Sequence, residues 1–216
     1  MAIKAAIFDL DGVIVNTVPL HFGAWKRMFE GYGHQFTMED YLAKVDGRPR
    51  LEGAAAILTE LSLEEIKKAG EIKQGYYQKL LDSEAIEIFE SSVKIIQQLK
   101  NRGIKLAAAS SSKNAVQILK KIKLYDVFDV NVSGADFEKG KPDPEIFLTA
   151  ASRLGAKPEE SVVFEDAKSG VDAAANGGFL CIGINRHHNA EALAKASRIV
   201  NDLSEISVDE ILKMGE

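Results

Sequence analysis

Two aspartates, Asp9 and Asp11, end a short apolar run in the stretch IFDLDGVIVNT of residues 7–17. Like charges repel, and taking carboxylates out of water is costly, so this pair needs a partner at the end of a buried strand. Residues two apart in an extended segment share a face, so both carboxylates are expected to point the same way. Their type and spacing predict a cation site.

Further polar side chains follow other predicted strands or lie in the loops behind them. They are Ser110, Ser111 and Ser112 with Lys113 and Asn114, then Lys141 in GKPDP, then Glu165 with Asp166 in FED. The carboxyl ends of parallel strands form the ligand-binding edge of a sheet, so we expect these segments to converge there. Clustered carboxylates suit Mg²⁺. Lysine, a serine hydroxyl and the N–H groups of a helix start suit a phosphoryl group.

The elements that must position these residues alternate from about residue 92 onward. Helices are predicted at 93–103, 113–124, 145–155 and 167–178, strands at 104–110, 128–134, 161–166 and 179–184, and a short strand and a last helix within 197–215. Alternating strands and helices predict right-handed parallel crossovers and therefore an α/β fold with a doubly wound, Rossmann-like parallel sheet. The apolar segment 3–9 is the first strand of that sheet.

The segment between residues 17 and 88 is different, because its apolar residues recur at helical spacing almost throughout. Ser62 followed by Glu65 predicts a capping box at the start of its last helix. We therefore expect a core domain made of residues 1–16 and 89–216, with a small helical domain, 17–88, inserted after the first strand.

Composition limits the classes of partner. The chain has 216 residues and a net charge of −5, which argues against a nucleic-acid surface. No apolar segment approaches the roughly 20 residues needed to cross a bilayer. The single cysteine, Cys181, sits in an apolar strand, forms no intrachain disulfide and fits a reducing compartment. The first residues lack the long apolar region of a signal peptide. We expect a cytoplasmic protein without membrane or nucleic-acid partners.

Together, DLDGVIVNT, the strand end at Ser110, GKPDP and FEDAKSG resemble the motifs of the haloacid dehalogenase-like superfamily, in the same order and over nearly the whole chain. The resemblance implies that Asp9 is the nucleophile that forms an aspartyl-phosphate and that Asp11 is the general acid and base. It also implies a Mg²⁺ cofactor. The implied metal ligands are Asp9, Asp11 (also through its backbone carbonyl), Glu165 and Asp166. The implied phosphate-binding residues are Ser110, Ser111, Ser112, Lys113, Asn114 and Lys141.

Within that superfamily, HFGAW at 21–25, Gly47 with Arg50, Lys73 and SSSKN resemble the β-phosphoglucomutase-like subfamily. The resemblance implies that the helical domain is a lid, or cap, and we expect a monomer because such a cap must move freely. The implied substrate-binding residues are His21, Trp25, Gly47, Arg50 and Lys73. Arg48 competes with Arg50 for the role of binding a distal phosphate, and Trp25 has a second reading as a core residue.

The implied reaction is conversion of β-glucose 1-phosphate to glucose 6-phosphate through the 1,6-bisphosphate, with a small phosphorylated sugar as partner. The alternative is a phosphatase that releases phosphate from sugar phosphates or similar small esters. A third reading is a scaffold of the same fold that binds phosphate without turnover. Asn16 replaces an aspartate that is usual in the family, and Glu90-Ser91 replaces a usual Pro-Gly, so hinge behaviour between the domains is open. The pair His187-His188 is expected to be exposed.

Overall fold

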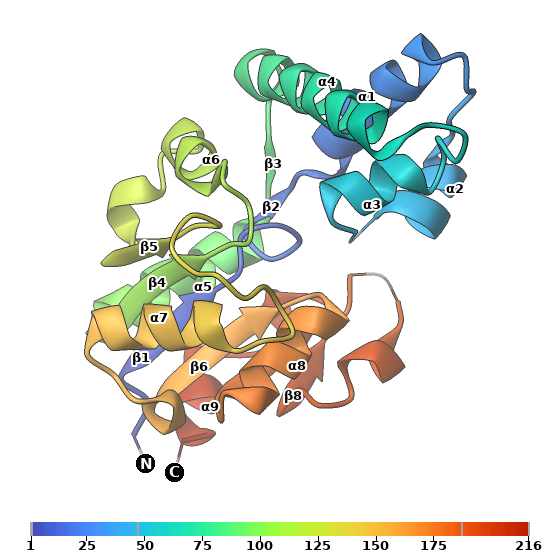
Figure 1. Cartoon of the computed structure of the whole chain (residues 1–216). Helices are drawn as coiled ribbons and strands as arrows, with labels where there is room; N and C mark the ends of the chain where they lie inside the picture. Colours follow the sequence, from blue (N-terminus) through green and yellow to red (C-terminus); the bar gives the residue numbers. More distant parts are fainter. Residues whose placement is uncertain (1, 47, 187, 216) are drawn as a thin grey trace. The chain divides into compact units, whose positions relative to one another are not determined.

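The computed structural model describes residues 2–46, 48–186 and 188–215, and the chain divides into two units (Figure 1). One unit comprises Met1–Asn16 and Glu87–Glu216, and the other is Thr17–Ile86. In the part of the chain that the structure describes, no helix is both long and apolar enough to cross a membrane.

The first unit is built on a six-stranded sheet in the order β5-β4-β1-β6-β7-β8. The strands are β1 (Ala5–Phe8), β4 (Lys105–Ala109), β5 (Val130–Val132), β6 (Ser161–Glu165), β7 (Leu180–Ile184) and β8 (Arg198–Val200). All neighbouring pairs are parallel, which confirms the doubly wound sheet. The chain adds β4 and β5 on one side of β1 and then crosses to β6 on the other side. The strand order therefore reverses between β1 and β6, and such sheets bind ligands at the carboxyl ends of the strands at this switch point.

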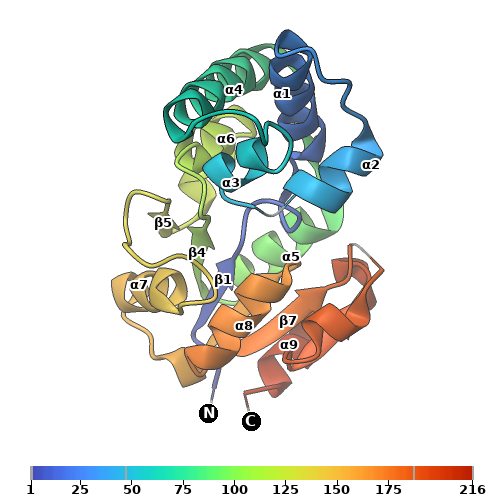
Figure 2. The same ribbon diagram turned by 45° about the vertical axis from the view of Figure 1, so that its right-hand side comes forward.

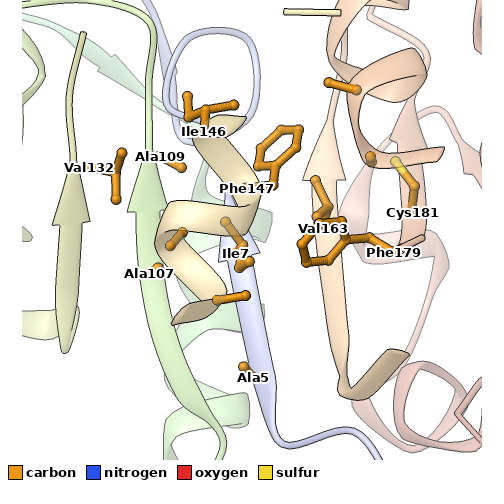
Figure 3. Close-up of a cluster of buried hydrophobic side chains, with 14 of the residues drawn as sticks. Ala5, Ile7, Ala107, Ala109, Val132, Ile146, Phe147, Val163, Phe179 and Cys181 are labelled. Atoms are coloured by element: carbon orange, nitrogen blue, oxygen red, sulfur yellow. The ribbon is translucent and has the colours of Figure 1, made fainter. Parts of the chain in front are cut away.

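Helices cover both faces of this sheet. They are α5 (Glu90–Asn101), α6 (Ala115–Lys121), α7 (Glu145–Leu154), α8 (Lys168–Asn176) and α9 (Val208–Lys213), with 3₁₀ turns at Tyr125–Val127, Pro158–Glu160, Ala190–Leu193 and Leu203–Glu205. In Figures 1 and 2, α7 and α8 lie over the same face of the sheet. Figure 3 shows Ile7, Ala107 and Val163 of three neighbouring strands close to Phe147 of α7. Because side chains alternate along a strand, Asp9 follows Ile7 on this face.

The second unit contains α1 (Val18–Gly31), α2 (Met38–Asp40), a π-helical turn η1 (Tyr41–Val45), α3 (Arg50–Ala55) and α4 (Leu63–Ser83). The predicted capping box is confirmed, because Ser62 Oγ accepts from the Glu65 N–H and Glu65 accepts from the Ser62 N–H at 2.8 Å. Although apolar residues recur at helical spacing through this unit, residues 38–45 form the short α2 followed directly by η1 instead of one α-helix. Trp25 is 4% exposed and its ring stacks on Phe29 at 5.3 Å, so it belongs to the core of this unit.

Two short strands carry the chain out of the first unit and back into it. Strand β2 (Val15–Asn16) and strand β3 (Glu87–Ile88) pair antiparallel, with Asn16 opposite Glu87. Asn16 Nδ2 donates to Glu87 Oε2 at 2.8 Å. This pairing places Glu87 and Ile88 in the first unit, whereas the sequence boundary was expected after residue 88. Two-residue strands leave no alternation pattern from which they could have been predicted.

Candidate active site

Lys141 joins two buried carboxylates at the switch point of the sheet. Its Nζ donates to Asp9 Oδ1 at 2.6 Å and to Glu165 Oε1. Asp9 directly follows β1 and Glu165 ends β6, so neighbouring parallel strands bring the two carboxylates side by side. Lys141 comes from the loop before α7. Its side chain is 10% exposed, and those of Asp9 and Glu165 are 8% and 1% exposed.

The pKa values of these groups follow from their burial and mutual charge. Burial disfavours the ammonium form of Lys141, but Asp9 and Glu165 outweigh it and raise the pKa of the lysine. Burial raises the pKa of Asp9 well above its usual value, Glu165 and Asp11 add to this, and Lys141 opposes it. Lys141 is thus the neighbour that favours the ionised form of Asp9, against the effects of burial and of the two carboxylates.

Glu165 is fixed by three neighbours. Besides Lys141, its carboxylate accepts from the backbone N–H of Ala167 at 2.7 Å, which closes the turn into α8. Its Oε1 lies 1.7 Å from where a Cβ would stand on Gly170 in α8, so a side chain at that position is excluded. Glu165 is therefore held as a partner of Lys141, with little freedom to turn elsewhere.

Asp11 and the serines after β4 meet in the same region. Ser110 is buried, and its Oγ donates to Asp11 Oδ2 at 3.3 Å while accepting from the Ser112 N–H at 3.0 Å. The Asn114 N–H donates to Ser112 Oγ at 3.1 Å, which turns the chain into α6. Two backbone-facing hydroxyls therefore shape this loop. Ser111 and Lys113 are exposed, and Asn114 is half-buried.

Asp166 lies against the turn that carries Asp11. A Cβ added to Gly12 would stand 1.9 Å from Asp166 Oδ2, and Gly12 has a φ of +78°. Only glycine combines that φ with such a close approach at no steric cost. The Asp166 carboxylate is consequently in contact with the backbone that directly follows the Asp11 carbonyl.

The metal ligands predicted from the sequence, Asp9, Asp11, Glu165 and Asp166, stay a prediction. Across residues 2–46, 48–186 and 188–215, no three His, Cys, Asp or Glu side chains form a group that could hold a metal. Lys141 lies between Asp9 and Glu165, and Glu165 accepts hydrogen bonds from Lys141 and from the Ala167 N–H. Asp9 and Asp11 after β1, and Asp166 beside Gly12, supply further carboxylate oxygens in this region. Such hard oxygens fit Mg²⁺, which keeps several of its waters in proteins.

His21 and Lys73 form a pair inside the second unit. Lys73 Nζ donates to His21 Nδ1 at 2.9 Å. It also lies 5.0 Å from the centre of the Trp25 ring and 4.9 Å from that of Tyr77, both within cation–π range. Two of the predicted substrate residues, His21 and Trp25 of α1, therefore contact the buried ammonium of a third, Lys73 of α4.

Burial controls the charge of this pair. It lowers the pKa of His21 to about 3, with Lys73 adding to the effect, so the imidazole is neutral near pH 7 and accepts at Nδ1. Burial also lowers the pKa of Lys73 to about 7, and Arg50 contributes in the same direction. Lys73, whose ammonium contacts an imidazole and two aromatic rings, is thus at the threshold of losing its charge near pH 7.

The remaining predicted substrate residues are less constrained. Arg50 begins α3, is exposed, and donates through Nη1 to Gln74 Oε1 at 3.1 Å. Its neighbour Arg48 is also exposed. Gly47 lies outside the described residues, as does His187, and His188 is exposed. Cys181 is buried in β7, as expected.

Two residues of the site were missed by the sequence analysis. The Tyr77 ring lies 4.4 Å from that of His21, and its position four residues after Lys73 on a predicted helix was a usable signal. Gly170 was visible as a glycine inside a predicted helix, which often marks close packing.

Comparisons with known proteins place the chain in a family. The family model described as "Haloacid dehalogenase-like hydrolase" matches residues 6–184. The phosphorylated carbohydrates phosphatase of Thermotoga maritima is 36% identical to this chain, over 94% of it and 99% of the relative. The β-phosphoglucomutase of Bacillus subtilis is 34% identical, over 95% of this chain and 92% of the relative.

Among solved structures, β-phosphoglucomutase from Clostridium difficile superimposes with a TM-score of 0.84 at 30% identity, covering 99% of this chain and 97% of that one. Fold, motifs and relatives therefore agree along almost the entire length. This chain is an enzyme of the haloacid dehalogenase-like hydrolase family and a β-phosphoglucomutase-like member of it.

Proposed function

We propose that this enzyme is a Mg²⁺-dependent phosphotransferase that moves a phosphoryl group of a small sugar phosphate through Asp9. The observation that carries the proposal is the buried Lys141, whose Nζ bonds Asp9 at 2.6 Å and also bonds Glu165. It favours the charged form of a buried carboxylate at the ligand-binding edge of the sheet. Positioning and charge neutralisation are what phosphoryl transfer needs from a protein.

In the proposed reaction, an Asp9 oxygen attacks phosphorus while the bond to the sugar oxygen breaks. Asp11 gives its proton to the departing oxygen, so an aspartyl-phosphate and a free sugar hydroxyl result. Ser110 and Lys141 bind the oxygens of the transferring group. Ser111, Ser112, Lys113 and Asn114 form the loop and helix start around it.

Mg²⁺ is the proposed cofactor, as enzymes of this family generally use it. Asp9, Asp166 and the Asp11 carbonyl are the groups that hold it in this proposal, and Glu165 acts through Lys141 instead of as a direct ligand. When bound, the ion offsets negative charge on the phosphoryl oxygens.

The unit Thr17–Ile86 is proposed to act as a cap that recognises the substrate. His21, Lys73 and Arg50 gather on α1, α4 and the start of α3, and Arg50 is close enough to lower the pKa of Lys73. A neutral imidazole and two nearby donors, Lys73 and Arg50, suit a sugar with a second phosphate. This cluster favours β-phosphoglucomutase activity, with β-glucose 1-phosphate converted to glucose 6-phosphate through the bisphosphate.

A sugar phosphatase is the second candidate, and the 36% identity to the Thermotoga maritima phosphatase favours it. The two reactions share the aspartyl-phosphate and differ in the acceptor, which is a sugar hydroxyl in the mutase and water in the phosphatase.

The test combines pure protein, Mg²⁺, β-glucose 1-phosphate and a trace of β-glucose 1,6-bisphosphate, with glucose 6-phosphate and free phosphate followed together. Glucose 6-phosphate without free phosphate supports the mutase. Free phosphate released in step with substrate loss supports the phosphatase. An Asp9→Asn variant is the control and should turn over neither substrate; turnover by that variant would contradict the role of Asp9.

A further inference from the structure

Arg186 is an interior arginine that none of the proposed catalytic steps uses. It follows β7, and its side chain is 18% exposed. Its guanidinium reaches three segments that are distant in the sequence: Nε donates to the Gly12 carbonyl at 3.1 Å, Nη1 donates to Asp202 Oδ2 at 3.1 Å, and the plane lies 3.9 Å from the centre of the Phe89 ring.

The Gly12 contact matters because glycine cannot fix its own conformation. Gly12 has no side chain to restrict its φ and ψ, and it is the residue between Asp11 and the rest of the turn. Its N–H donates to the Val15 carbonyl at 2.8 Å, which holds the peptide before it. Arg186 holds the peptide after it. Both peptide planes around Gly12 are thus fixed, and Asp166 rests against the space between them.

The other two contacts attach this turn to the segment that returns from the second unit. Phe89 directly follows β3, and its N–H donates to the Ile14 carbonyl at 2.9 Å. Asp202 accepts from Ser91 Oγ at 2.8 Å as well as from Arg186. Although burial raises it, hydrogen bonds from Ser204, Ser91 and Arg186 hold the pKa of Asp202 well below its usual range, so the ion pair persists at neutral pH.

We propose that Arg186 is a positioning residue that fixes the Asp11–Gly12 turn to the base of the β2–β3 linker and thereby places Asp11 for proton transfer without touching substrate. This inference rests on the proposed function, since it concerns how Asp11 is placed. A planar fork suits the role, because one group can donate in two directions while stacking on an aromatic ring.

The test compares Arg186→Met and Arg186→Lys with Arg102→Met in the full chain. Arg102 also pairs with an aspartate of the first unit, Asp209 at 2.6 Å, but it is exposed. For Arg186→Met we expect kcat to fall about 10- to 100-fold with KM changed less than about 3-fold, because a misplaced catalytic group affects turnover more than binding. Arg186→Lys should recover part of kcat through the Asp202 ion pair. Arg102→Met should stay within about 2-fold of wild type.

A second readout, amide hydrogen exchange, needs no substrate. In Arg186→Met, the amides of Gly12 and Phe89 should exchange at least about 10-fold faster, while the Asp9 amide, which bonds the Phe164 carbonyl, should not change. Faster exchange throughout β1 and β6, or a kcat equal to wild type, overturns the proposal. If wild type turns over no sugar phosphate, the proposed function fails. Exchange alone then decides whether Arg186 holds the turn, and unchanged exchange at Gly12 overturns it.

Discussion

Lys141 is the residue on which the charge balance of the active site depends. It contacts Asp9 and Glu165 in a region where all three side chains are at most 10% exposed. Removing one member of a buried ionic group costs far more than the group contributes in net stability, because the remaining charges lose their partner. Removing Lys141 should therefore reduce both the stability of the fold and the activity of the enzyme, and the two effects can be measured separately.

Lys141→Met should lower the free energy of unfolding by about 3–5 kcal/mol at pH 7. Without the ammonium, burial and Glu165 raise the pKa of Asp9 further, so in the folded variant Asp9 holds its proton to a higher pH than in the unfolded state. The difference in free energy of unfolding between wild type and Lys141→Met should therefore shrink as pH falls from 7 toward 5. Urea unfolding at both pH values measures this, and kcat should fall by at least about 100-fold.

Lys139→Met is the matched control for that variant. Lys139 lies in the same loop, is 74% exposed and approaches Asp143 only at 3.9 Å. Its loss should change the free energy of unfolding by less than about 0.5 kcal/mol at either pH. Equal effects of the two variants would show that the buried contacts of Lys141 contribute no more to the free energy of unfolding than an exposed lysine does.

Lys73 presents the opposite case, a buried lysine whose removal should stabilise the fold. Its pKa is about 7 in the folded state and near 10.5 in the unfolded state. Between these two pH values, the unfolded state therefore holds more protons than the folded state. Stability is then reduced at pH 7 and recovers as pH rises toward 10.5. Lys73→Met should raise the free energy of unfolding by about 1–3 kcal/mol at pH 7 and reduce turnover of sugar phosphates.

Wild type should also gain about 1–2 kcal/mol relative to Lys73→Met between pH 7 and pH 9, measured by urea unfolding. Lys67→Met, at an exposed position of the same helix, is the control and should show no such pH dependence. A Lys73→Met variant that is less stable than wild type at pH 7 would mean that the His21 and aromatic contacts outweigh the desolvation of the charge.

At the scale of elements, helix α8 can pack closely against the end of β6 because Gly170 has no side chain. The Glu165 carboxylate occupies the space beside Gly170, 1.7 Å from a Cβ built there. Gly170→Ala should therefore lower the free energy of unfolding by about 1–2 kcal/mol, despite the better helix propensity of alanine, and lower kcat by at least about 10-fold. Urea unfolding and steady-state kinetics measure the two effects.

Gly75 in α4 provides the comparison, since nothing lies within 4 Å of a Cβ built on it. Gly75→Ala should raise the free energy of unfolding by about 0.5–1 kcal/mol without changing kcat. If both alanine variants stabilise, Glu165 moves freely enough to make room and its fixed position is not required.

The long elements were predictable because each has a strong period and clear end signals. Strand β6 has three consecutive apolar residues, 162–164, between Ser161 and Glu165, and α4 begins at a capping box and follows helical spacing for 21 residues. The π-helical turn η1 and the two-residue strands β2 and β3 were not predictable. Their form depends on tertiary pairing, such as Asn16 with Glu87, and not on local preference.

The site residues divide in the same way. Asp9, Lys141 and Glu165 could be found because strand ends and their loops meet at one edge of a parallel sheet. That Glu165 would turn toward Lys141 could not be predicted, since it depends on Gly170 and on the path of a loop far away in the sequence. Arg186 also stands at a strand end, but its partners come from three distant segments.

At the scale of the whole molecule, each unit has a core of its own. One cluster includes Ile7, Phe147 and Val163 of the first unit, and another includes Trp25, Phe29 and Phe36 of the second. The chain passes between the units through β2 and β3, whose pairing places Asn16 directly opposite Glu87. Since these two residues already face each other, the first unit does not need the second to close its own chain.

Replacing Thr17–Ile86 by the dipeptide Asn-Gly should therefore give a folded core protein. A two-residue loop of that type joins two antiparallel residues that are directly opposite each other. The shortened chain keeps Asp9, Asp11, Ser110, Lys141 and Asp166 and loses His21, Arg50 and Lys73. We expect cooperative thermal unfolding, and kcat/KM for a simple aryl phosphate within about 10-fold of wild type. For β-glucose 1-phosphate we expect a loss of at least about 100-fold.

The shortened chain carrying Asp9→Asn is the control and should hydrolyse neither compound. A core that folds but loses both activities equally would place the second unit in the chemistry itself, beyond substrate recognition. A core that keeps both would remove His21, Arg50 and Lys73 from the list of specificity residues. The shortened chain lacks only the proposed recognition groups. If it keeps activity on the aryl phosphate and loses activity on β-glucose 1-phosphate, the second unit determines substrate choice and the first performs phosphoryl transfer.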